Sequence, residues 1–600
     1  MKLYAFRDIS ISSPDQHHLP VSVDIELGLR NIGFTRFSTD FGFHDALSNL
    51  FNKLRDAHTR YSKPECYANF VFRLSPSVTL SSIMLNGTQS IVMNDPSGDF
   101  DGQVVATIDG VDAFTAVQNW ASEYGRDSLD LGTRFNQALK AFTTRPLATY
   151  NFPQDESMTF TFQQSRATIF LPWVAYSQRN VSSITSLHRL CKPQTTEIRN
   201  GSIPYIDYLD NGLHFDSHEE RLQHHRTALQ QHIEEMHSSL KKEQQQQQQP
   251  SSKSKSSTSS KTTHSSTHIS HATHGSSGQV VYQTKNIIFS IVKPGVGALK
   301  IPSFFPSEFG LDTIYSIKSI PEFLFDIQRV YVLAFEMNVN DLIIDLRGNG
   351  GGWVCLAMEF LRILFPGTNG SQPAGELFDM ISSPLLLELA TKAAQLPRDV
   401  YSIFSPWKFL DPTTLQPYTT TSWLTPGFTY VRGGQTGFYS NMVTDDCSMV
   451  DIPQWNPKYL FSPSNVLILT DGTCGSACAL VARNIQERMQ ARTMVVGGIQ
   501  GRSQMIASFI GGLVYDLPTL LEEVKLLGLT NSPNAPKPLP TSANLRFTLW
   551  EQYPWVNRAQ PPIPAEFVFE ASDYRLMYTR SSVNDNNQLY TDAYNMWKSG

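Results

Sequence analysis

Three side chains that could act as nucleophiles lie close together in the stretch DGTCGSACAL at positions 471–480. They are Cys474, Ser476 and Cys478, and the apolar run NVLIL directly precedes the stretch. This pattern predicts a buried strand, a glycine-containing turn and a helix, with the turn at the helix N-terminus. Free N–H groups and the helix dipole favour negative charge there, so Ser476 could attack a carbonyl carbon and its anionic intermediate would be stabilised.

The two cysteines are weaker candidates for the nucleophile. Cys474 and Cys478 are four residues apart and lack the two-residue gap of zinc-binding and redox pairs. Buried packing cysteines or a local disulfide are commoner outcomes than a catalytic thiol. The stretch also differs from the Gly-x-Ser-x-Gly turn of α/β-hydrolases, because Cys474 stands where the first glycine belongs. We therefore favour Ser476.

A second strand, glycine turn and helix are predicted over residues 341–365, in DLIIDLRGNGGGWVCLAMEFLRILF. The loop at 348–352 offers backbone N–H groups to a negative charge. No Lys-Ser/Thr follows it, as a P-loop would require, and Trp353 stands where a dinucleotide-binding motif has its last glycine. We expect an oxyanion site here rather than a nucleotide site, and a tight structural turn is the alternative.

A serine nucleophile needs a base, and no histidine follows His274. Outside the low-complexity tract described below, the candidates are His17, His18, His44, His58, His188 and His214. His58 stands out because it follows an apolar pattern of helical spacing over residues 43–54 and lies in a polar turn. Catalytic groups are commonly presented at such element ends. A surface or capping histidine is the alternative interpretation.

Composition and charge exclude several classes of protein. A length of 600 residues predicts three or four domains. The net charge of -6, without a basic stripe in the folded parts, predicts no nucleic-acid partner and no anionic membrane surface. The sequence has no membrane-spanning apolar run and no signal peptide, so we expect a soluble chain, secreted only if the N-terminus is incomplete. Six cysteines are too few for a disulfide framework and leave the compartment open.

A low-complexity tract at about 217–278 contains KKEQQQQQQPSSKSKSSTSS and is predicted to be disordered, because it has little apolar surface to bury. The tract is rich in histidine. Its one zinc-like stretch, HEERL at His218, has Leu222 where the second ligand belongs. We therefore expect neither a metal nor another cofactor.

Taken together, LIIDLRGNGGG followed by LILTDGTCGSACAL resembles peptidase family S41, the C-terminal processing or tail-specific proteases. DAHTRY at residues 56–61 is similar to the histidine motif of one branch, which contains the chlamydial protease-like activity factor and its fungal relatives. The commoner S41 enzymes use a lysine base in a turn after a VVG strand. Here that turn, at 497–502, carries Arg502, and a guanidinium does not accept a proton at neutral pH. The resemblance thus implies a serine, histidine and glutamate mechanism.

The resemblance also implies a role for each residue. Ser476 would be the nucleophile and His58 the general base, while the N–H groups of Gly351 and Ala477 would bind the oxyanion. Glu566, in IPAEFVFE, is the glutamate expected to orient the imidazole. Glu570 and Glu551 are its rivals, and an ordinary strand-edge carboxylate is the alternative interpretation of Glu566.

We therefore predict a multidomain α/β protein with an S41-type α/β core. Its parts are an N-terminal helical segment with the histidine motif at 1–75, a PDZ-like domain at 76–185, a connecting region with the insert at 186–285, and the catalytic core at 286–600. The PDZ-like prediction depends on GQVVATIDGVDAFTAVQNWASEYG, which reads as a strand, an Asp109-Gly110 turn and a helix.

The expected function is that of a serine endopeptidase with a polypeptide substrate, and a homo-oligomer is left open. A catalytically silent, peptide-binding scaffold is one alternative. A serine hydrolase or acyltransferase acting on small esters is another, since related cores support different reactions.

Overall fold

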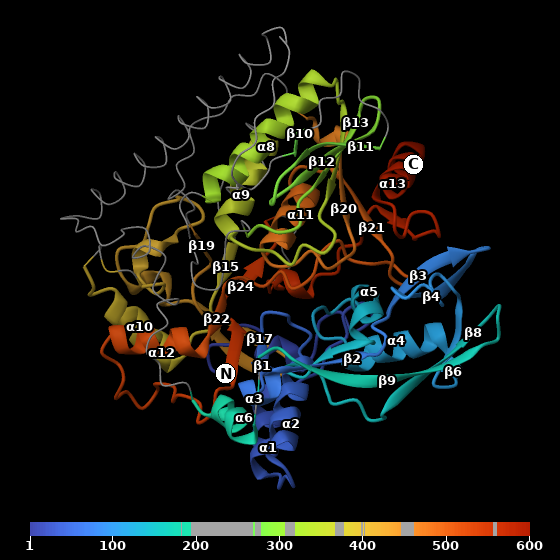
Figure 1. Ribbon diagram of the computed structural model, residues 1–600. Helices are drawn as coiled ribbons and strands as arrows, with labels where there is room; N and C mark the ends of the chain where they lie inside the picture. The colour runs from blue at the N-terminus through green and yellow to red at the C-terminus, as the bar shows by residue number, and fades with distance from the viewer. Residues whose placement is uncertain are drawn as a thin grey trace, which may run out of the picture.

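The computed structural model describes residues 1–179, 181, 183–193, 268–269, 278–305, 319–365, 377–397, 400, 402–445, 461–555 and 561–600. Several sheets flanked by helices make up the chain, which confirms a multidomain α/β architecture (Figure 1). The low-complexity tract lies almost entirely outside the described residues, so its disorder stays a prediction.

The centre of the C-terminal part is an eight-stranded sheet of order β10-β11-β12-β13-β14-β20-β21-β25. The first four strands are antiparallel, and the strands from β13 to β25 are parallel. Their bounds are β10 His268–Ile269, β11 Gln279–Gln283, β12 Ile288–Lys293, β13 Val296–Lys300, β14 Asp341–Asp345, β20 Val466–Thr470, β21 Arg492–Val496 and β25 Tyr574–Leu576.

Helices cover both faces of this sheet, which explains why its central strands are continuous apolar runs. On one face lie α8 (Ser319–Glu336), α9 (Val354–Leu364) and α11 (Ala477–Glu487), while the C-terminal helix α13 (Asn586–Ser599) lies on the other (Figure 1). The strands and helices expected around the glycine loop and around Ser476 are thus confirmed.

The N-terminal segment is built into the C-terminal part through a small sheet of order β1-β23-β22. Helices α1 (Ile25–Phe34) and α2 (Asp40–Asn52) lead to β1 (Arg60–Ser62). Strand β1 pairs with β23 (Asn544–Thr548), which pairs with β22 (Val514–Asp516). This pairing carries the segment that contains His58 across to the core, although almost the whole chain separates the two strands.

A second unit has its own hydrophobic core and a six-stranded sheet of order β6-β5-β8-β9-β2-β7. The expected strand, Asp109-Gly110 turn and helix are present in it. Its PDZ-like identity and the domain boundaries stay predictions. Its elements are β2 Phe70–Leu74, β3 Thr79–Leu85, β4 Thr88–Asn94, β5 Val105–Ile108, β6 Val111–Asp112, α4 Ala113–Tyr124, α5 Leu131–Ala141, β7 Thr144–Pro146, β8 Ser157–Phe162 and β9 Thr168–Ser177.

The remaining elements surround these sheets. A disulfide between Cys66 and Cys191 joins the short helices α3 (Glu65–Ala68) and α6 (Ile184–Cys191). No helix in the described part of the chain is long and apolar enough to cross a bilayer. The other elements are β15 Leu377–Asp379, α10 Pro384–Ala393, β16 Phe409–Leu410, β17 Phe428–Arg432, β18 Gln435–Tyr439, β19 Val443–Asp445, α12 Leu517–Leu526, β24 Glu551–Tyr553 and five short 3-10 turns at Ile9–Ile11, Pro406–Lys408, Thr421–Trp423, Pro463–Asn465 and Ala565–Phe567.

Asp345, at the end of β14, is held by a buried ion pair with Arg347 and by a hydrogen bond from α13. The Asp345 carboxylate accepts hydrogen bonds from Arg347 Nε (2.8 Å) and from the Tyr590 hydroxyl of α13 (2.8 Å). Burial alone would raise the pKa of Asp345, but the Arg347 guanidinium outweighs burial and holds that pKa below its ordinary value. The start of the glycine loop is therefore fixed by charge as well as by packing.

We predict that Asp345→Ala lowers the free energy of unfolding by about 3 kcal/mol, because it leaves the Arg347 charge buried without its partner. Urea unfolding monitored by tryptophan fluorescence measures the change. Glu522→Ala is the control, because it breaks an exposed pair with Lys525 and should cost under about 1 kcal/mol. Equal losses in the two variants would contradict the prediction.

Candidate active site

The site lies at the carboxyl ends of β14 and β20, which are adjacent and parallel in the central sheet. Each strand runs into a glycine-containing loop and then into a helix, α9 after β14 and α11 after β20. Parallel strands that pair in register end at the same edge, and ligands bind at that edge of open α/β sheets. The two loops singled out in the sequence therefore face each other.

Ser476 is the N-cap residue directly before α11, and its backbone is unusual. It has φ 55° and ψ -127°, a conformation rare for a residue with a side chain, and its hydroxyl makes no capping hydrogen bond to the helix. Gly351 of the facing loop has φ 107°, and a Cβ there would lie 2.6 Å from Ser476 Cβ and 3.1 Å from Ala477 N. Only glycine permits this close approach of the two loops.

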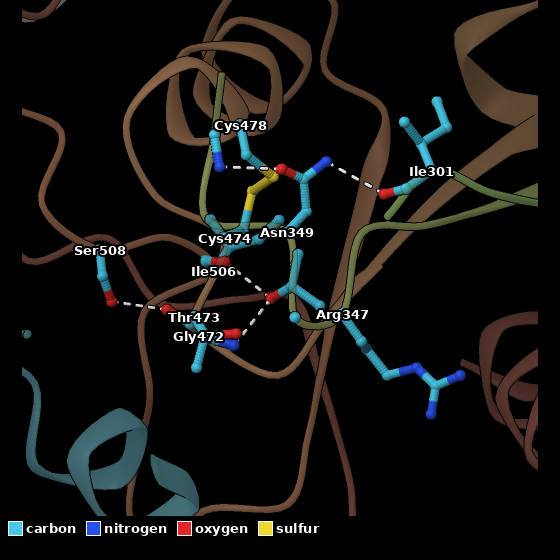
Figure 2. Close-up of a disulfide and its surroundings, with 12 residues drawn as sticks. Ile301, Arg347, Asn349, Gly472, Thr473, Cys474, Cys478, Ile506 and Ser508 are labelled. Atoms are coloured by element: carbon cyan, nitrogen blue, oxygen red, sulfur yellow. Dashed lines mark hydrogen bonds between the residues drawn. A yellow bond between two sulfur atoms is a disulfide. The ribbon is translucent and has the colours of Figure 1, made fainter. Parts of the chain in front are cut away.

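Cys474 and Cys478 form a disulfide with an S–S distance of 2.02 Å (Figure 2). Both sulfurs are therefore committed, which removes the cysteines as free nucleophiles and leaves Ser476 between them. The disulfide closes a ring of five residues that spans the turn and the first helical residues. It thus restrains both the serine backbone and the Ala477 N–H group.

Two polar residues, Asn349 and Asp471, hold the loops against each other. Asn349 donates from its side chain to the Ile301 carbonyl at 3.0 Å, and its backbone carbonyl accepts the Gly475 N–H at 3.2 Å (Figure 2 shows the side chain). Asp471 Oδ1 accepts the Gly348 N–H at 3.3 Å and the Thr473 N–H at 3.0 Å. The sequence pattern does not single out either residue, although each lies inside one of the two strand, turn and helix motifs.

The free N–H donors of the glycine loop differ in part from those expected. The Gly351 N–H donates to Asn349 Oδ1 at 2.9 Å and is thus already occupied. The N–H groups of Gly350 and Gly352 have no acceptor in the described part of the chain, and both residues line the cavity beside Ser476. An incoming oxyanion would find them free, whereas it would have to displace Asn349 to use Gly351.

His58 lies on the wall of the same cavity as Ser476, a space of about 790 Å³. Asp56 shapes the turn that presents it: one carboxylate oxygen accepts the His58 N–H at 2.9 Å, and the other accepts the Thr59 and Thr548 hydroxyls, each at 2.6 Å. The structure thus brings the expected serine, the expected histidine and the glycine loop to one cavity.

The imidazole of His58 is nearly inaccessible, with the residue 4% exposed. Its Nδ1 is buried and has no hydrogen-bond partner among the described residues, and no hydrogen bond joins the ring to Ser476 Oγ. The ring of Phe509 packs edge-to-face on the imidazole, with centroids 5.3 Å apart, and fills the space beside Gly475. Phe509 also has φ 35°, and nothing in the local sequence signals this position.

Glu566 is buried in the 3-10 turn Ala565–Phe567, so the strand-edge interpretation of this residue is wrong. Its carboxylate accepts the Ile510 N–H at 2.5 Å, one residue from Gly511, whose backbone lies beside the imidazole of His58. Burial raises the pKa of Glu566 well above its ordinary value, and the charge of Asp56 adds to the shift. The carboxylate makes no direct hydrogen bond to His58.

The two rival glutamates are engaged elsewhere. Glu551 is buried and pairs with Arg432, with 2.6 Å between its Oε2 and Arg432 NH1. Glu570 pairs with Arg483 of α11 at 2.9 Å. Neither lines the cavity that contains Ser476 and His58. No cluster of metal-ligating side chains is present among the residues that the structure describes.

Part of the chain is similar to known peptidases. A family model described as Peptidase family S41 matches residues 295–508, which include both loops but neither His58 nor Glu566. The Peptidase S41 family protein phomP1′ of Diaporthe leptostromiformis is 24% identical over 38% of this chain and 41% of its own length. The Peptidase S41 family protein ustP of Aspergillus flavus is 25% identical over 40% of this chain and 57% of its own length. The alignments thus span less than two thirds of either relative.

Among solved structures, mature CPAF has a TM-score of 0.49 at 12% identity, covering 95% of this chain and 89% of that chain. The photosystem II D1 C-terminal processing protease has a TM-score of 0.27 at 9% identity, covering 95% of this chain and 90% of that one. The part of the chain that carries both loops is thus similar to peptidase family S41.

We predict that His58 makes the fold less stable in acid. Burial lowers its pKa to about 4, against partial compensation by Asp56. Between pH 6.5 and 4 the unfolded chain therefore binds a proton that the folded chain does not, so the free energy of unfolding falls with falling pH, by about 3 kcal/mol for this group. His58→Gln should remove that part of the slope in urea unfolding at a series of pH values.

His17→Gln is the matched control, because His17 is exposed and should leave the slope unchanged. The same slope in wild type and His58→Gln would show that the imidazole is not held in its neutral form.

Proposed function

We propose that the protein is a serine endopeptidase that hydrolyses peptide bonds through an acyl-enzyme on Ser476. One observation carries the proposal: Ser476, His58 and the glycine loop share a single cavity, although they come from three distant parts of the chain. The match of residues 295–508 to Peptidase family S41 supports the choice of a peptide substrate.

In the proposed reaction, His58 takes the Ser476 proton as the hydroxyl attacks the peptide carbonyl, and later gives that proton to the leaving amine. The oxyanion is stabilised by the Ala477 N–H at the start of α11, together with a free N–H of the glycine loop, from Gly350 or Gly352 or from Gly351 once it is released by Asn349. Water then attacks the acyl-enzyme, with His58 again acting as the base.

The proposal requires His58 to come within hydrogen-bond reach of Ser476. Catalytic hydrogen bonds are often long before substrate binds and shorten in the complex. Phe509 is the side chain that has to move with the imidazole, because it packs against both His58 and the residue before the nucleophile. A peptide that enters the cavity meets this ring.

Glu566 is proposed to stabilise the imidazolium that forms during the reaction. Its carboxyl group is held next to the Gly511 backbone, which contacts the imidazole, and the buried Nδ1 of His58 has no other partner. A carboxylate that reaches Nδ1 would fix the ring and offset its positive charge.

A serine hydrolase acting on small esters would use the same serine, histidine and N–H donors. A catalytically silent scaffold would use only the cavity, to bind a peptide. An intact serine, base and set of free N–H donors favours an enzyme over the scaffold. Comparing turnover of denatured casein with that of a short acyl ester separates the two enzymes.

We predict that Ser476→Ala and His58→Ala each lower casein hydrolysis by about 10⁴-fold or more, because each removes a group that the chemical step needs. Release of acid-soluble peptides and digestion profiles by mass spectrometry measure the loss. A fluorophosphonate probe should label wild type but not Ser476→Ala.

Ser464→Ala and His17→Ala are the controls, because both residues are exposed and neither lines the cavity. Full activity in either cavity variant would refute the mechanism. Failure of the probe to label folded wild type would favour the scaffold.

We predict that Glu566→Gln lowers kcat by about 10²-fold or more with little change in KM, since the amide cannot balance the imidazolium charge. Glu570→Gln is the matched control, because its carboxylate pairs with Arg483 and lies outside the cavity. Steady-state kinetics on one peptide measures both variants. Wild-type kcat in Glu566→Gln would exclude this residue as the third member of the triad.

A further inference from the structure

Two arginines stand directly opposite each other in the small sheet beside His58. Arg60 begins β1, and the antiparallel register pairs it with Arg546 of β23. Both residues line the cavity that contains Ser476 and His58. Like charges directly opposite each other on paired strands destabilise a sheet. This arrangement therefore lowers stability unless groups of opposite charge offset the repulsion.

Arg546 has a structural explanation. Its guanidinium donates to the Ala57 carbonyl at 2.7 Å and to the His58 carbonyl at 3.2 Å, and so supports the turn that presents the imidazole. The charges of Asp56, Asp127 and Asp516 act on it. Its donors are thus largely occupied with positioning His58.

The contacts of Arg60 within the described part of the chain do not account for its charge in the same way. Its guanidinium makes no hydrogen bond in the described part of the chain, and its one ion pair, with Asp127, has 3.6 Å between the nearest atoms. Asp127 is shared, because Arg126 approaches the same oxygen at 3.5 Å. The side chain of Arg60 is 26% exposed, so its donors can be reached from the cavity.

The electrostatics agree with an excess of positive charge at this wall. The pKa of Arg60 is lowered to about 9, chiefly by burial. The charges of Arg126 and Arg546 also lower this pKa, while Asp127 and Tyr150 raise it. A guanidinium in this setting gains from an additional carboxylate, which its planar donors bind in a bidentate manner.

We propose that Arg60, supported by Arg546, is a specificity-determining residue that selects peptides with an acidic side chain close to the scissile bond. The inference rests on the proposed peptidase function and deepens it by naming the substrate class. Arg60 donates to the substrate carboxylate across the cavity, while Asp127 keeps the guanidinium oriented toward that cavity. A neutral glutamine in the same place offers one weaker acceptor and leaves the charge of the wall unbalanced.

Positional peptide libraries that fix Glu or Gln at one position of an otherwise randomised sequence test the proposal. With wild type, we expect kcat/KM to be at least about tenfold higher for Glu than for Gln at one position near the cleaved bond. In Arg60→Gln this ratio should fall to about twofold or less, while turnover of the Gln library stays within about threefold of wild type. Arg60→Gln relieves the contact between like charges, so the variant should fold.

Two further variants make the outcome specific to charge. Arg60→Lys should retain part of the preference, and Arg60→Glu should favour Lys over Glu at the same position. Arg30→Gln, an exposed change on α1 outside the cavity, is the matched control and should keep the wild-type ratio. A wild-type ratio near one at every position, or an unchanged ratio in Arg60→Gln, would overturn the proposal.

Binding to Ser476→Ala separates this inference from the proposed function. If wild type cleaves no peptide, the peptidase proposal fails. Fluorescence anisotropy with the same labelled libraries then still decides the specificity. Tighter binding of the Glu library to Ser476→Ala, lost in Ser476→Ala/Arg60→Gln, supports the role of Arg60, and equal binding of both libraries overturns it.

Discussion

The parallel pairing of β14 with β20 is the constraint on which the rest of the site depends. In register, Leu342 lies opposite Val466 and Asp345 opposite Leu469, so the two strands end together at one edge of the sheet. Their loops can then approach until only hydrogen fits at Gly351. A slip along either strand would separate Ser476 from the glycine N–H groups by the rise of at least one residue, about 3.3 Å.

Several buried polar residues hold the two loops close together and take no part in the proposed reaction. Asp345 fixes the end of β14, Asp471 ties the two loops together, and Asn349 holds the glycine loop through one side chain and one carbonyl. The disulfide between Cys474 and Cys478 adds a covalent restraint around Ser476. A strained backbone such as that of Ser476 persists only where its surroundings hold it this firmly.

The parts of the site that depend on local pattern could be predicted from the sequence. The strands and helices around both loops follow from apolar runs and helical spacing, and Ser476 follows from its place at a helix start. What depends on distant pairing could not be predicted. Arg60 and Arg546 meet only because β1 pairs with β23, and Phe509 reaches His58 only through the tertiary fold. The family resemblance was enough to name Glu566 as a candidate. Its burial in a 3-10 turn could not be predicted, because no local sequence pattern indicates it.

The proposed mechanism gives the buried side chains of His58 and Glu566 opposite charges. Burial alone drives His58 toward neutral imidazole and Glu566 toward neutral acid, so each charge taken singly is costly. In the proposed reaction His58 becomes positively charged as it takes the Ser476 proton. A carboxylate beside the ring then offsets the cost of that charge, and the imidazolium in turn offsets the cost of the carboxylate. Burying the two charges therefore costs least when His58 and Glu566 are charged together. In the proposed reaction, the transition state has this pair of charges.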